Sequence, residues 1–149
     1  MSEPVDLLIH SAEQLCVVPT HDEGPQRGAA LGDLGLIPDG ALVARNGRVV
    51  AVGPSAELRA RFQAEITIDA GGRCVIPGFV DPHTHLPWAG DRAGEFEQRL
   101  AGATYMEIMN AGGGIMSTVR NTRQAPIDEL VADNLPRLAR MLRHGTTSA

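Results

Sequence analysis

The chain has 149 residues, of which 43% are hydrophobic and 21% charged, a composition typical of globular proteins rather than of disordered, collagen-like or membrane-spanning ones. Its formal net charge is −5, and its basic residues are spread singly, so we expect no binding of nucleic acid or of a membrane surface. All 13 Lys and Arg positions are arginines, which leaves no lysine here for a Schiff base or a metal-bridging carbamate.

The N-terminal residues do not resemble a targeting segment. They lack a basic start and a long apolar region, and no run in the chain approaches the ~20 apolar residues of a membrane span, so we expect a soluble, cytoplasmic protein. Residues 5–18 contain two short apolar runs and predict a strand pair or one bent strand. Residues 19–40 are dense in Gly, Pro and Asp and predict an irregular loop.

A hairpin and a short helix are expected next. Asn46-Gly47 lies between two β-prone segments, and this dipeptide favours a tight turn because both residues tolerate a positive φ. Residues 55–64 carry helix formers and open with Ser55, which predicts a short helix with Ser55 as its N-cap. Residues 1–72 are therefore expected to form a small, strand-rich layer.

The pattern changes after this layer. The run "CVIPGFV", residues 74–80, is continuously apolar and typical of a strand buried on both faces. Helical patterns follow from Thr104 onward, and the first of these helices is expected to end at Gly112–Gly114.

A longer helix is expected over residues 126–145, where apolar side chains fall on one stripe. Pro136 lies inside the stripe and removes a backbone donor, so it predicts a kink or two abutting helices. The last four residues, "TTSA", resemble the start of another strand.

Two histidines follow the apolar run. In an extended strand, residues two apart face the same way, so His83 and His85 are expected to point to one side, together with Asp81. Converging imidazoles suit a divalent metal, and Asp81 would accept a hydrogen bond from one ring. A His-x-His pair also occurs as two ordinary polar residues at a strand end. The position after a buried strand, where α/β barrels keep their active sites, favours the metal interpretation without excluding the other.

The residues around this pair resemble a known family. "PGFVDPHTHL" is similar to the signature that opens the barrel of the metal-dependent amidohydrolase superfamily. "DPHTHLPWAGDRAGEFEQRLAGATYMEIMNAGGGIMSTVRNTR" resembles the imidazolonepropionase family within it, over about Val75 to Arg123. This resemblance implies an α/β fold: residues 1–72 as the N-terminal part of a small β-sandwich domain, and residues 73–149 as the first part of a (β/α)8 TIM barrel, truncated after one β/α unit with an enlarged loop.

The resemblance also implies site residues. Family members bind one divalent metal, zinc or iron, and His83 and His85 match its first two ligands. Arg92 matches the arginine that binds the substrate, and its planar guanidinium suits a carboxylate. From the residues alone, without the resemblance, a surface arginine paired with Asp91 or Glu95 is the favoured interpretation of Arg92.

The implied reaction is hydrolysis of the cyclic amide of 4-imidazolone-5-propanoate to N-formimidoyl-L-glutamate, in histidine degradation, by a metal-activated water. No catalytic residue is assigned within this span. The remaining metal ligands and the proton-transfer groups would come from later strands. The small-molecule substrate is the expected partner, and the resemblance implies a homodimer for the full-length protein.

A complete barrel needs roughly 250 residues, so we expect this chain to be the N-terminal portion of the enzyme and inactive by itself. Two alternatives stay open. Another metal-dependent amidohydrolase, such as a deaminase or a dihydroorotase-like enzyme, would share the two histidines but would not need the downstream block. A non-catalytic, truncated remnant that binds a partner would need no metal.

Overall fold

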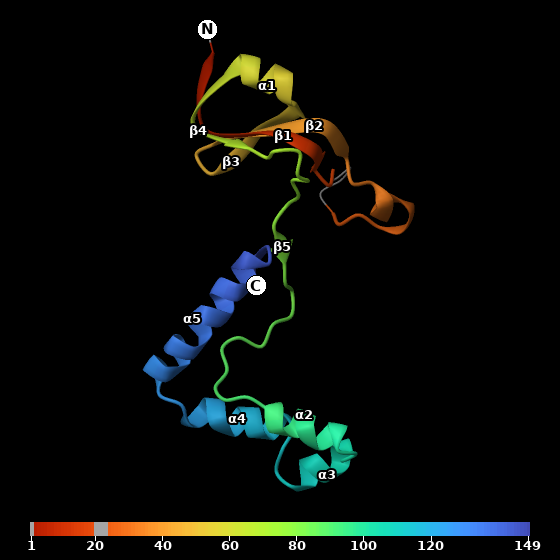
Figure 1. The fold of residues 1–149 in the computed structure, drawn as a ribbon, viewed down its shortest axis with the longest axis vertical. Coiled ribbons are helices and arrows are strands. Elements are labelled where there is room, and N and C mark those ends of the chain that lie inside the picture. The colour runs from red at the N-terminus through yellow and green to blue at the C-terminus, as the bar shows by residue number, and fades with distance from the viewer. Residues whose placement is uncertain (1, 20–23) are drawn as a thin grey trace. The chain divides into compact units, whose positions relative to one another are not determined.

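A computed structural model describes residues 2–19 and 24–149. The chain is a mixed α/β protein that divides into two compact units, Met1–Pro77 and Gly78–Ala149, and Figure 1 shows the elements of each. Part of the predicted loop, residues 20–23, lies outside the described residues. Within the described part, none of the helices is long and apolar enough to cross a membrane.

The first unit is built on one four-stranded sheet in the order β3-β2-β1-β4. β1 pairs antiparallel with β2 and parallel with β4, and β2 pairs antiparallel with β3. The strands are β1 (Glu3–Cys16), β2 (Leu36–Arg45), β3 (Arg48–Pro54) and β4 (Phe62–Asp69).

The hairpin prediction is confirmed. Asn46 and Gly47 join β2 to β3 with φ values of 52° and 71°, the left-handed conformations that a tight turn requires. The predicted loop is shorter than expected, because β2 begins at Leu36 and a 3-10 helix, η1 (Gly28–Gly32), occupies part of the remainder. Because β2 pairs with β1 from Leu36 onward, the end of the segment that was predicted as a loop is part of a strand.

β1 is one strand with an irregularity, as the bent-strand alternative predicted. Its register with β2 shifts between Ile9 and Ala12, and Ser11 there has a φ of 57°. The Ser11 amide donates to the Ser55 hydroxyl over 2.8 Å, and this hydroxyl donates to the Gly40 carbonyl over 3.0 Å. The prediction of Ser55 as an N-cap is therefore wrong, because its hydroxyl accepts a hydrogen bond from a backbone amide at the irregularity of β1 and not from an amide of the helix.

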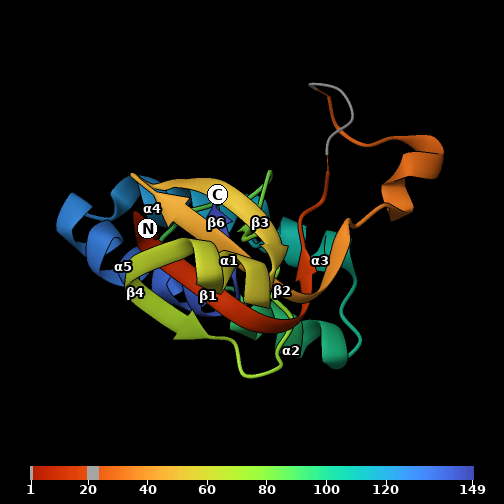
Figure 2. The same ribbon diagram turned by 90° about the horizontal axis from the view of Figure 1, so that it is seen from above.

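Helix α1 (Ser55–Arg61) packs against this sheet and closes its core. Pro54 is its N-cap. Figure 2, viewed from above, shows α1 lying over the strands. Burial of apolar surface is the main stabilising contribution here, and the principal cluster consists of Val5, Leu8, Ala41, Val43, Leu58 and Phe62.

The second unit contains two short parallel strands joined through four helices. β5 pairs with β6 in parallel, a connection that requires a crossover. The predicted helix before Gly112, the long helix with Pro136 inside it and the final strand are all present. The elements are β5 (Phe79–Val80), α2 (Ala93–Leu100), α3 (Tyr105–Asn110), α4 (Ile115–Gln124), α5 (Ile127–Arg143) and β6 (Thr146–Ser148).

The prediction of one buried strand over residues 74–80 is wrong. Val75 forms an isolated bridge with Leu15 in the first unit, whereas Phe79 and Val80 form β5 in the second and are 54% and 68% exposed. The run is thus divided between two units, because hydrophobicity indicates burial without specifying the partner.

Gly78 lies where β5 approaches β6. A Cβ atom added to Gly78 would lie 2.9 Å from Thr147 Cβ and closer still to both branches of that side chain. The amide of Phe79 donates to Gly145 O over 2.7 Å, and that of Asp81 donates to Ser148 O over 2.9 Å. Glycine at this position therefore permits the close pairing of the two strands.

Candidate metal and substrate site

The histidine pair lies on the segment between β5 and α2, not within a strand. The expectation of an extended strand is wrong here, because regular structure stops at Val80 and Pro82 contributes no backbone donor. The rings nevertheless converge: His83 Nε2 and His85 Nε2 lie 3.1 Å apart, and the rings stack with centroids 5.2 Å apart and planes 10° apart. Both residues are exposed.

Asp81 fixes the start of this segment. Its amide is bonded to β6, as described above, and its Oδ1 accepts a hydrogen bond from the His83 amide over 3.1 Å. The sequence predicted that this carboxylate would accept from an imidazole ring. The prediction is wrong in its target, because an Asx turn satisfies the carboxylate locally and orients the histidine backbone instead.

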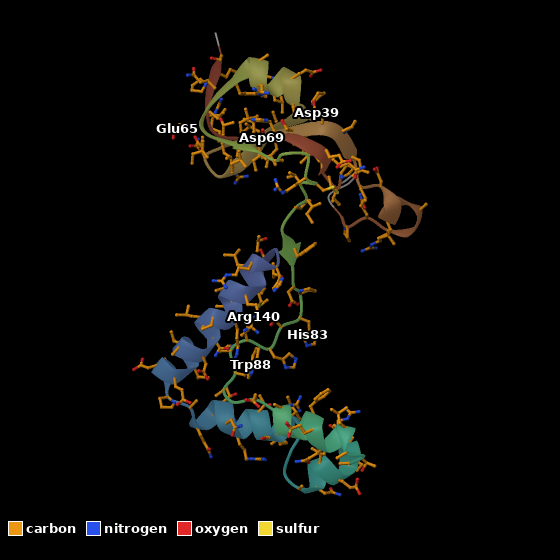
Figure 3. All side chains as sticks on the ribbon, in the orientation of Figure 1. Asp39, Glu65, Asp69, His83, Trp88 and Arg140 are labelled. Carbon is orange, nitrogen blue, oxygen red and sulfur yellow. The ribbon has the colours of Figure 1, made fainter. Side chains whose placement is uncertain are left out.

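The far end of the segment is fixed by α4 and α5. The Trp88 amide donates to Asn134 Oδ1 over 3.2 Å, and Asn134 Nδ2 donates back to Trp88 O over 3.1 Å. The Ala89 amide donates to Thr122 Oγ1 over 3.1 Å. Figure 3 shows His83 and Trp88 on this segment, between β5 and α2.

Asn134 was missed by the sequence analysis. It is only 5% exposed and also donates to Leu130 O over 2.6 Å, which anchors it to its own helix. Its one sequence signal is an amide residue among the apolar positions of α5. Since a buried amide needs hydrogen-bond partners, that signal indicates a structural bond without identifying Trp88 as the partner.

A pocket of about 270 Å³ opens beside His85. Arg92 occupies the N-cap position of α2, and its Nη1 lies 3.8 Å from Glu95 Oε2. Trp88 contributes a wall, and its ring also lies under the Arg137 guanidinium, 4.1 Å from ring centroid to Cζ. The lining residues are His85, Trp88, Asp91, Arg92, Ile115 and Thr118.

The pair has the spacing of two metal ligands. Two imidazole nitrogens, each 2.0–2.1 Å from a tetrahedral zinc ion, lie about 3.3 Å apart, and the observed separation is 3.1 Å. An N–H···N hydrogen bond between neutral rings has the same length. Among the described residues, no group of three or more His, Cys, Asp or Glu side chains is placed to hold a metal. The pair therefore fits as part of a ligand set.

Sequence comparison identifies the family. A model described as "Amidohydrolase family" matches residues 66–147, which include the histidine pair and the whole second unit up to β6. The chain belongs to the amidohydrolase family. A second model, "Imidazolonepropionase-like composite domain, bacteria", matches residues 40–62, so both units resemble parts of amidohydrolases.

Individual amidohydrolases agree with this assignment and confirm the resemblance seen in the sequence. An imidazolonepropionase of Chloroflexus aggregans is 58% identical over 99% of this chain and 34% of its own length. That of Symbiobacterium thermophilum is 54% identical over 97% of this chain and 34% of its own. A probable imidazolonepropionase of Xenopus laevis is 45% identical over 99% and 34%. The chain thus spans about a third of the length of the curated relatives it matches.

The solved structure of an enzyme also matches. The crystal structure of an adenosine deaminase from Xanthomonas campestris with bound zinc aligns with a TM-score of 0.59 and 28% identity, over 99% of this chain and 28% of the deaminase. The backbone of this chain is therefore similar to part of a deaminase that was crystallised with bound zinc.

Proposed function

We propose that the protein carrying this chain is an imidazolonepropionase, which hydrolyses 4-imidazolone-5-propanoate to N-formimidoyl-L-glutamate. The observation that carries the proposal is that one segment presents two converging imidazoles and, in the same pocket as His85, a guanidinium from Arg92. Cleavage of a cyclic amide that bears a propionate requires both an activated water and a carboxylate-binding group.

We propose the following architecture for the whole protein. The first unit forms part of a small β-sandwich, and the second is the first β/α unit of a (β/α)8 barrel. The parallel pairing of β5 with β6 across a helical connection supports this. So does the place of the histidines, which follow the C-terminal end of β5, the end at which barrels keep their active sites.

In this proposal His83 and His85 hold one divalent ion, zinc or iron, through Nε2, and further ligands come from other strands of the barrel. A bound ion would lower the pKa of its water, so that hydroxide is available as the nucleophile at neutral pH, and would polarise the amide carbonyl. This chain holds the segment that carries the two rings in place. The backbone bond between Asp81 and β6 fixes one end of the segment, and the bond between Trp88 and Asn134 fixes the other.

Arg92 is proposed to bind the propionate carboxylate of the substrate. It presents five donors in a planar fork that matches a carboxylate, and its side chain is 45% exposed. Trp88 and Ile115 supply apolar wall to the same pocket. A homodimer is a prediction of the family resemblance alone, and a cytoplasmic location is an expectation of the sequence analysis.

The decisive experiment is an assay of the complete gene product, loaded with zinc or iron, on 4-imidazolone-5-propanoate. We expect formation of N-formimidoyl-L-glutamate, and loss of it after chelation of the metal. The Arg92→Lys variant should raise KM more than it lowers kcat, because a point charge replaces a bidentate clamp. Absence of turnover in a metal-loaded, folded protein would overturn the proposal.

A deaminase is the second candidate, favoured by the 28% identity with the zinc-bound adenosine deaminase. Deaminases release ammonia from an exocyclic amine, whereas the proposed reaction opens a ring without releasing it. Ammonia measured across a panel of adenosine, guanine and cytosine with the same protein preparation separates the two. Ammonia release with no product from the imidazolone would favour the deaminase.

A further inference from the structure

Glu95 connects the two helices that border the pocket. It lies in the first turn of α2, and its side chain is 19% exposed. One carboxylate oxygen, Oε1, accepts a hydrogen bond from the Gly114 amide over 2.8 Å. The other, Oε2, lies 3.8 Å from Arg92 Nη1. A single carboxylate thus contacts the N-cap residue of α2 and the N-cap residue of α4.

These two contacts lie at the starts of the two helices whose N-terminal ends border the pocket. Arg92 is the N-cap of α2, and Gly114 is the N-cap of α4, whose residues Ile115 and Thr118 contribute to the same pocket. A carboxylate is favourable at both places, because helix N-termini present unpaired amides and a positive dipole end. Movement of Glu95 would therefore disturb its contacts at the starts of both helices together.

The turn before α4 is packed directly on this carboxylate. A Cβ atom added to Gly113 would lie 2.9 Å from Glu95 Oε1 and 2.7 Å from Ile108 Cγ2. Gly114 has a φ of 71°, a conformation that favours glycine. The glycines first interpreted as a helix end thus also allow the backbone amide of Gly114 to reach Glu95.

We infer that Glu95 is a positioning residue, which orients the Arg92 guanidinium toward the carboxylate of the substrate. Through its bond to the Gly114 amide, it also holds that guanidinium at a fixed position relative to α4. The inference rests on the proposed function, in which Arg92 binds that carboxylate. At 3.8 Å the Glu95 carboxylate attracts the guanidinium as an ion pair rather than through a hydrogen bond, so the donors of Arg92 stay available for the substrate. It also limits the rotamers of a half-exposed side chain that must otherwise be ordered on binding.

The test compares Glu95→Gln and Glu95→Ala with the control Glu97→Gln, an exposed carboxylate two residues along the same helix. The glutamine keeps an oxygen for the Gly114 amide but removes the charge beside Arg92. In the complete gene product we expect KM to rise about threefold to fivefold in Glu95→Gln with kcat within twofold, the range of a partly exposed ion pair. Glu95→Ala should raise KM further, and the control should change neither constant. An unchanged KM in Glu95→Gln would overturn the inference.

A second measurement separates this inference from the proposed function. In the 149-residue chain, the Arg92 Nε–H and Gly114 amide signals are followed by ¹⁵N NMR. Glu95→Gln should move the Arg92 signal and leave Gly114 nearly in place, whereas Glu95→Ala should move both. An Arg92 signal that stays at its wild-type position in both variants contradicts the inference, whether or not the complete protein hydrolyses 4-imidazolone-5-propanoate. Failure of the assay alone overturns only the function.

Discussion

In the proposed site each imidazole of the pair supplies a single nitrogen, so loss of either ring would remove one of the proposed metal ligands. We predict that His83→Ala and His85→Ala each reduce the metal content of the complete gene product from about one ion per chain to a small fraction of that. The measurement is elemental analysis after dialysis. His144→Ala is the matched control, because His144 is also exposed but forms the C-cap of α5. Retention of full metal content in either histidine variant would exclude the pair as ligands.

Asn134 carries the second residue-scale prediction. Asn134→Ala should lower the free energy of unfolding of the 149-residue chain by about 2 kcal/mol, because it leaves the Trp88 amide without its acceptor in a partly buried site. Urea unfolding followed by fluorescence of Trp88, the only tryptophan, measures this. Asn110→Ala, at the exposed end of α3, should change it little. Equal effects of the two substitutions would contradict a special role for Asn134.

At the scale of the element, α3 contains a pH-dependent capping box. Thr104 and Glu107 bond each other reciprocally, and the hydrogen bonds from the Thr104 backbone and side chain lower the pKa of Glu107 below its ordinary value of 4.5. A lowered pKa in the folded state means that the stabilisation is present above pH 4.5 and lost as the pH falls through the lowered pKa.

We therefore predict that the Glu107 amide of α3 loses protection from hydrogen exchange as the pH falls below about 4.5, after correction for the intrinsic rate. Glu107→Gln should remove this pH dependence while keeping an acceptor for the Thr104 amide. Glu97→Gln serves as the control and should leave the dependence intact. A wild-type protection that is flat across this pH range would show that the capping box has no electrostatic component.

Pro136 offers a test within α5. It lies inside the helix and is exposed, so Pro136→Ala restores a backbone donor without removing buried contacts. The gain from the added helical bond exceeds the loss of rigidity in the unfolded chain, and we expect the free energy of unfolding to rise by about 1–2 kcal/mol. Urea unfolding with circular dichroism at 222 nm measures it. A fall in stability would show that the proline ring contributes packing.

Elements with local signals could be predicted from the sequence, and those that depend on distant partners could not. The Asn46-Gly47 hairpin and α5 follow from turn chemistry and from the spacing of apolar residues, both local properties. Helix α2 was not predicted, because Gly94 and the preceding loop residues weaken its pattern. β5 was predicted too long, since nothing in "CVIPGFV" indicates that its two ends pair with different units.

The site shows the same division. His83, His85 and Arg92 were singled out because their types and spacing resemble a family. The structure brings the two imidazoles together and places Arg92 in the pocket beside His85, although the segment is not the strand that the spacing predicted. Glu95 was considered only as a partner of Arg92, and its bond to Gly114, 19 residues away, depends on how α2 and α4 are placed. Residues that position a site thus act through tertiary contacts, which leave little trace in a single sequence.

For the whole molecule, the ligand count carries the prediction. A zinc ion takes four ligands, and in the proposed site His83 and His85 would supply two of them. We therefore expect the 149-residue chain to bind zinc weakly and to show no turnover of 4-imidazolone-5-propanoate. Calorimetric titration with zinc and a product assay test the two statements. A metal-loaded imidazolonepropionase of Chloroflexus aggregans is the positive control. Measurable turnover by the 149-residue chain would mean that other groups complete the site.

The close approach of Gly78 to Thr147 has a genetic consequence. When the gene is mutagenised at random and active clones are selected, we expect replacements of Gly78 to be as rare among those clones as replacements of the two histidines. This is expected although Gly78 has no side chain that could bind a ligand. Both branches of Thr147 already crowd the space that a methyl group would fill, so no side-chain rotation accommodates even alanine. The absence of a side chain at residue 78 thus permits the strand pairing from which the segment with the histidine pair starts.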